Sequence, residues 1–116
     1  MPPTSPPGTS RPIVAYLPDL MDRSRVAAVA AELGRELVVS RTPADLVARA
    51  DEPEATFVVD LSRAGAVEIL AALPAGRSFA IAGHVDRELM RAARAAGDVR
   101  VLARSAFFAS LGELLA

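Results

Sequence analysis

The sequence lacks several residue types on which protein chemistry often depends. It contains no cysteine, which excludes disulfide bonds, thiol catalysis and cysteine-ligated metal sites. A single histidine, His84, excludes a histidine-rich metal site as well. All 13 basic residues are arginine and none is lysine, so the chain cannot build a phosphate-binding loop of the Walker type.

Charge of one sign and long hydrophobic runs are also missing. The formal net charge is −1, with acidic and basic residues interspersed, so we expect no nucleic-acid partner and no anionic membrane surface as a partner. No apolar run approaches the roughly 20 residues that span a bilayer. The first twelve residues lack the basic start and apolar stretch of a secretory signal, which predicts a cytoplasmic protein.

The length and composition of the chain predict one globular domain preceded by a polar tail. The chain has 116 residues, of which 52% are apolar and 23% charged, which suits a single soluble core. Residues 1–11 are rich in proline, serine, threonine and glycine, and we interpret them as a flexible tail. The domain is therefore expected over residues 12–116.

Short apolar runs and helical patterns alternate five times within this domain. The apolar runs predict strands at residues 13–17, 36–40, 55–60, 78–83 and 99–103. The helical patterns lie at residues 23–33, 43–50, 67–73, 87–96 and 107–115. Strands that are apolar on both faces, joined by short loops, indicate an α/β fold: a single doubly wound (βα)5 domain with a five-stranded parallel sheet, flavodoxin-like in strand order.

The stretch FAIAGHVDRELMRAARAAGDVRVLARSAF (79–107) resembles the second half of a response-regulator receiver domain. In such domains a strand is followed by a helix that ends in Ala-Ala-Gly and then by a further strand. Asp60, at the end of the third strand, falls where that family carries its phosphoacceptor aspartate. The resemblance covers residues 12–116 and implies a receiver-like fold and a role in signal transduction or a phosphorelay.

Several residues depart from what the resemblance implies for phosphorylation. A receiver holds Mg²⁺ with two acidic residues at the end of its first strand, where this chain has Leu17 and Pro18, with Asp19 just beyond. Ala82 replaces the hydroxyl residue, and Arg104 replaces the lysine. We therefore interpret the chain as a degenerate receiver, a non-catalytic signalling or protein-interaction module without a metal or other cofactor.

Two alternatives keep a phosphorylated residue. In the first, Asp60 accepts a phosphoryl group and Asp19 helps to hold Mg²⁺; its structural counterpart is an aspartate that caps the next helix or binds loop amides. In the second, VVDLSR (58–63) resembles the anti-sigma factor antagonist (STAS-like) domains, in which a serine at this place is phosphorylated. Ser62 would be that serine, or a helix cap.

A third alternative is a small-ligand domain. Ligands of doubly wound folds bind beyond the carboxyl ends of the strands, at the point where strand order reverses. The residues expected there are Tyr16, Asp60, His84 and Arg104. No nucleophile–base pair or pair of carboxylates has catalytic spacing, so we expect no enzyme activity.

A protein partner or a second copy of the chain is the expected occupant of the surface formed by the fourth helix, fifth strand and fifth helix. That surface would include Arg91, Arg94 and Arg100. Phe107 and Phe108 are adjacent and cannot both point straight into one core stripe, so one is a candidate for partner contact unless both pack at the flanks of a wide stripe.

Overall fold

The computed structural model describes residues 11–83 and 86–116 and contains one five-stranded sheet. The strands are β1 (Ile13–Tyr16), β2 (Leu37–Val39), β3 (Thr56–Asp60), β4 (Ser78–Ala82) and β5 (Arg100–Ala103). Every pairing is parallel and the strand order is β2-β1-β3-β4-β5. The predicted doubly wound fold is confirmed.

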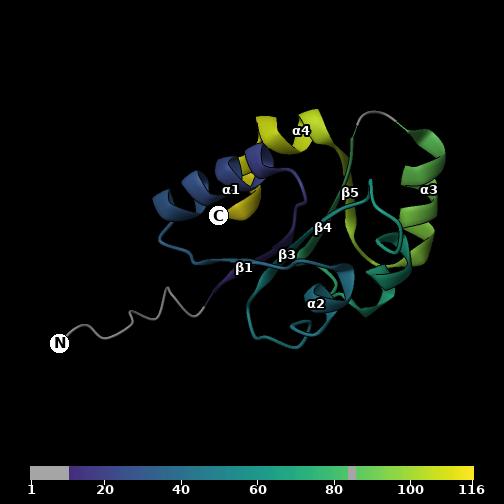
Figure 1. The fold of residues 1–116 in the computed structure, drawn as a ribbon, viewed down its shortest axis with the longest axis horizontal. Coiled ribbons are helices and arrows are strands. Elements are labelled where there is room, and N and C mark those ends of the chain that lie inside the picture. The colour runs from purple at the N-terminus through teal and green to yellow at the C-terminus, as the bar shows by residue number, and fades with distance from the viewer. Residues whose placement is uncertain (1–10, 84–85) are drawn as a thin grey trace.

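Helices cover both faces of the sheet (Figure 1). The helical elements are α1 (Leu20–Glu32), α2 (Pro43–Val47), η2 (Val67–Ala72), α3 (Arg87–Ala96), α4 (Arg104–Ala109) and α5 (Leu111–Leu115). One face carries α1, α4 and α5, and the other carries α2, η2 and α3. Among the described residues, none of these helices has the length and apolar character needed to cross a membrane.

Each face of the sheet has its own hydrophobic core. Val14, Phe57 and Val59 belong to the core under α2, η2 and α3, whereas Ile13 and Val58 belong to the core under α1, α4 and α5. Successive side chains of a strand point to opposite faces, so strands covered on both sides are apolar at every position. This explains why β1 and β3 appear in the sequence as unbroken apolar runs.

Four predicted helices differ from the observed ones. The helix expected at residues 43–50 is shorter, because α2 ends at Val47. The helix expected at residues 107–115 begins earlier, at Arg104, and is divided at Ser110 into α4 and α5. The helix expected at 67–73 is the 3₁₀ helix η2. The first helix begins at Leu20 rather than after Asp22, because the Asp19 side chain caps it.

Arg35 ties the residues before β1 to the start of β3 and to α5. Its buried guanidinium donates hydrogen bonds to the carbonyl oxygens of Arg11, Pro12 and Leu115 and to the Thr56 hydroxyl. Burial, with a smaller contribution from Arg11, lowers the pKa of Arg35 below its ordinary value. Arg11, the last residue of the predicted tail, thus packs on the domain, and the other tail residues lie outside the described part of the chain.

Candidate functional site

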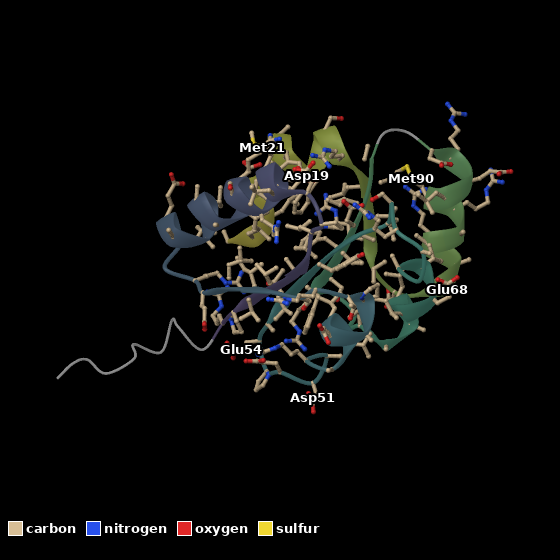
Figure 2. All side chains as sticks on the ribbon, viewed as in Figure 1. Asp19, Met21, Asp51, Glu54, Glu68 and Met90 are labelled. Carbon is tan, nitrogen blue, oxygen red and sulfur yellow. The ribbon has the colours of Figure 1, made fainter. Side chains whose placement is uncertain are left out.

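The carboxyl ends of the strands bring the predicted site residues to one edge of the sheet. Asp60 ends the central strand β3, Ala82 ends β4, and Arg104 follows β5 directly. Asp19 lies at the start of α1, close to α4, as Figure 2 shows. His84 lies outside the described residues.

Asp60 is a buried carboxylate that binds the loop after its own strand. Asp60 is buried, and its Oδ1 accepts a hydrogen bond of 2.8 Å from the backbone N–H of Ser62. The structural interpretation of Asp60 as a ligand of loop amides is therefore correct. The prediction that Ser62 caps a helix is wrong, because η2 begins after Ala66 and Ser62 lies exposed in the preceding turn.

Asp19 uses its carboxylate to begin α1. Its Oδ1 accepts hydrogen bonds from the backbone N–H groups of Met21 at 2.7 Å and Asp22 at 3.2 Å. These bonds satisfy two amides that a helix start would otherwise leave without an acceptor. The acid expected to help at the site is thus also a helix cap.

The most buried acid of this edge is Asp22, which was not predicted from the sequence. Its side chain is fully buried and pairs with Arg104, whose Nη2 donates to Asp22 Oδ1. The second oxygen, Oδ2, is also buried and has no hydrogen-bond partner among the described residues. Burial raises the pKa of Asp22; Arg104 opposes this shift, and the negative charges of Asp19 and Asp60 add to it.

A signal for Asp22 was present in the spacing of α1. The buried positions of this helix are Asp22, Val26 and Ala30, four residues apart. Residues at i and i+4 share a helix face, so extending the apolar stripe of Val26 and Ala30 back by one turn reaches Asp22. A carboxylate on the buried stripe of a helix needs a partner, and Arg104 supplies it.

The aromatic ring of Phe108 lies against the guanidinium of Arg104. The guanidinium carbon of Arg104 lies 5.5 Å from the centre of the Phe108 ring, and that of Arg25, from α1, lies 4.1 Å from it. Phe108 is half-buried and meets Phe107 edge-on at 5.1 Å. Phe107 is fully buried in the core under α1, so of the two adjacent phenylalanines Phe108 is the one that keeps exposed surface.

The side chains at this edge do not fit the magnesium site that the resemblance implies. Asp22 pairs with a guanidinium, and Asp19 and Asp60 each accept amide hydrogen bonds. Nowhere in residues 11–83 and 86–116 do three acidic or histidine side chains gather closely enough to hold a metal ion. Mg²⁺ requires several oxygen ligands in near-octahedral geometry, which this set does not assemble.

A cleft of about 420 Å³ opens beside these residues, at the ends of β1 and β2. Tyr16 lines it, as the small-ligand alternative expects, but Asp60 and Arg104 do not. Those two residues are engaged with Ser62 and Asp22 instead. The remaining lining comes from the end of β2, from α1 and from the loops after β1, β2 and β3.

Comparison with known proteins shows the fold of this chain. No family model matches the sequence, and no curated protein matches it. The crystal structure of FixJ-N superposes with a TM-score of 0.69 at 18% identity, covering 90% of this chain and 93% of that one. The crystal structure of a response regulator from Hahella chejuensis gives a TM-score of 0.73 at 13% identity, covering 90% and 92%. The chain therefore has the fold of a response-regulator receiver domain.

Proposed function

We propose that this chain is a receiver-like signalling module that acts by binding a protein and not by accepting a phosphoryl group. The buried ion pair between Asp22 and Arg104 carries this proposal. Arg104 stands at the position where the resemblance implies the lysine that contacts the phosphoryl group. In this chain the cation is held by a carboxylate and covered by Phe108.

The energetic reason lies in the burial of Asp22. An ionised carboxylate removed from water is strongly destabilising unless a cation faces it, so Arg104 cannot leave Asp22 for a phosphoryl group without cost. Recruiting Arg104 to Asp60 would leave Asp22 unpaired. The Asp22–Arg104 ion pair therefore favours a site in which Arg104 stays on Asp22 and does not move to Asp60.

The proposed partner surface is the one formed by α3, β5, α4 and α5. β5 is an edge strand, paired only with β4, and Arg91, Arg94 and Arg100 are exposed. A groove of about 410 Å³ runs beside this edge, lined by Arg100, Leu102, Ala106, Ser110, Glu113 and Leu114. Half-buried apolar residues bordered by charges of both signs suit a protein partner or a second copy of this chain.

A second candidate function is phosphorylation of Asp60, and its place in the fold favours it. Asp60 ends the central strand, as the resemblance requires, and its carboxylate bonds one loop amide within the described residues. Asp19 and Asp60 both raise the pKa of Asp22, so three carboxylates share this edge of the sheet. For this function Arg104 would have to exchange Asp22 for the phosphoryl group.

Amide NMR spectra recorded with Mg²⁺ and then with beryllofluoride, a mimic of an acyl phosphate on aspartate, distinguish the two functions. We expect no localised shifts at millimolar Mg²⁺, and spectra of the wild type and of Asp60→Asn that respond alike. Shifts centred on Asp19, Asp60, Ala82 and Arg104 that are lost in Asp60→Asn would overturn the proposal in favour of phosphorylation. Concentration-dependent broadening confined to α3, β5 and α4 in the same spectra would identify the partner as a second copy.

A further inference from the structure

The cleft at the ends of β1 and β2 is lined by three arginines from three separate elements. Arg23 comes from α1, Arg41 follows β2, and Arg63 belongs to the loop after β3. The other residues that line the cleft are Tyr16, Leu17, Pro18, Val39 and Ser40. In the described part of the chain no acidic residue lines the cleft, although the whole sequence has a net charge of −1.

Among the described residues, the three guanidiniums have no carboxylate partner. In residues 11–83 and 86–116 the ion pairs are Arg49–Glu52 and Arg104–Asp22, and neither involves a residue of the cleft. The Nε of Arg23 is buried and has no hydrogen-bond partner in the described part of the chain. Like charges that line one cleft repel each other, and a buried donor without an acceptor is costly. An anion bound in the cleft relieves the repulsion among the guanidiniums.

The position of the cleft supports a ligand site. The strand order β2-β1-β3-β4-β5 reverses at β1 and β3, whose following helices, α1 and η2, lie on opposite faces of the sheet. In open α/β sheets ligands bind at this point, beyond the carboxyl ends of the strands. The cleft lies beside this point, at the ends of β1 and β2, and the loop after β3 adds Arg63 to its lining.

We propose that this cleft, defined by Arg23, Arg41 and Arg63, binds the phosphate group of a phosphorylated small molecule. Guanidinium groups present two parallel N–H donors and match phosphate oxygens in bidentate fashion. The volume of about 420 Å³ lies within the range of roughly 300–1,000 Å³ for small-molecule sites and exceeds what inorganic phosphate fills. Leu17, Pro18 and Val39 offer apolar surface for the remainder of the molecule.

Binding of inorganic phosphate and of phenyl phosphate to the wild-type chain tests this site. Titrations followed by amide NMR at constant ionic strength, with chloride as the reference anion, should shift Tyr16, Leu17, Arg23, Ser40, Arg41 and Arg63. Phenyl phosphate should bind at least tenfold more tightly than inorganic phosphate. Equal affinities would still support a phosphate site but would assign it to the free anion.

Charge-matched variants separate a built site from general attraction. Arg41→Gln/Arg63→Gln should weaken phosphate binding at least tenfold, whereas Arg87→Gln/Arg91→Gln, which removes two exposed arginines of α3, should leave it unchanged. Arg23→Gln should weaken binding as well, and Asp60→Asn should not. Phosphate shifts no larger than those with chloride, or equal losses in both double variants, would overturn the proposal.

Discussion

Two neighbouring regions at the carboxyl edge of the sheet use arginine in opposite ways. In the first, Arg104 faces the buried Asp22 and packs over Phe108, and its side chain is 31% exposed. In the second, Arg41 and Arg63 are exposed and line a cleft to which no acid of the described residues contributes. We call the first the closed region, because Asp22 balances the charge of Arg104, and the second the open region, because its arginines are available to an anion.

The difference shows that the partner of an arginine, and not the arginine itself, decides what it can do. A guanidinium held by a buried carboxylate stabilises the fold and is not available to a ligand. A guanidinium without a carboxylate adds little to stability but concentrates positive charge. Arg35 uses its guanidinium in a third way: it donates to backbone carbonyls and thereby joins distant parts of the chain.

The largest expected effect on stability comes from removing Arg104, the cation of the closed region. Arg104→Ala leaves Asp22 buried without a counter-charge, so the free energy of unfolding at pH 7 should fall by about 3 kcal/mol. Asp22→Asn removes the buried charge and leaves Arg104 free to reach solvent, and it should cost only about 1 kcal/mol. Urea unfolding of both variants and the wild type measures the two values.

The unequal losses of stability expected for Arg104→Ala and Asp22→Asn test whether the buried charge of Asp22 is what requires Arg104. Arg49→Ala, which removes one partner of the exposed pair with Glu52, is the control and should change stability by less than about 0.5 kcal/mol. Equal losses in Arg104→Ala and Asp22→Asn would show that the two side chains matter for packing alone. A larger loss in Asp22→Asn would show that Arg104, and not Asp22, is the group that needs a partner.

The second effect is a pH dependence that belongs to Asp22. Its pKa in the folded protein is raised above the ordinary value of 3.8, so between these two values the folded state binds more protons than the unfolded state. Stability contributed by Asp22 therefore falls as pH rises through this window and is greatest at low pH. The unfolding free energy of the wild type minus that of Asp22→Asn, measured by urea unfolding from pH 4 to 8, should decrease as pH increases.

Taking this difference cancels the titration of the other carboxylates, which both proteins share. Arg104→Ala removes the charge that opposes the shift, so its window should extend to higher pH than that of the wild type. A difference that increases with pH would mean that attraction to Arg104 outweighs burial. In that case the closed region would stabilise the fold most at neutral pH.

The fold could be predicted from the sequence because its signals are local and repeated. Each apolar run marks a strand, and β1, β3 and β4 are buried at almost every position. The side chains of Thr42 and Asp86 cap the helices expected at residues 43–50 and 87–96. The break at Ser110 was not predictable from periodicity, since the apolar pattern continues through it.

The candidate site was less predictable because its contacts join distant residues. Asp22 and Arg104 are 82 positions apart, and their pairing depends on where α1 begins and on how it packs beside α4. Each was visible alone, Asp22 as a first-turn acid and Arg104 as the residue after a strand. That one would neutralise the other is a property of the assembled sheet and helices.

The smallest expected effect is on stability in the open region. Arg41→Gln and Arg63→Gln remove exposed charges that have no carboxylate partner within residues 11–83 and 86–116, so each should leave the unfolding free energy within about 0.5 kcal/mol of the wild type. Any change should be a gain at low salt, since repulsion among the guanidiniums is relieved, and should vanish at high salt, where the charges are screened. Urea unfolding at about 0.02 and 0.5 M NaCl tests both statements. A loss above about 1 kcal/mol in either variant would place these arginines in the same class as Arg104, as parts of the fold with no capacity left for an anion.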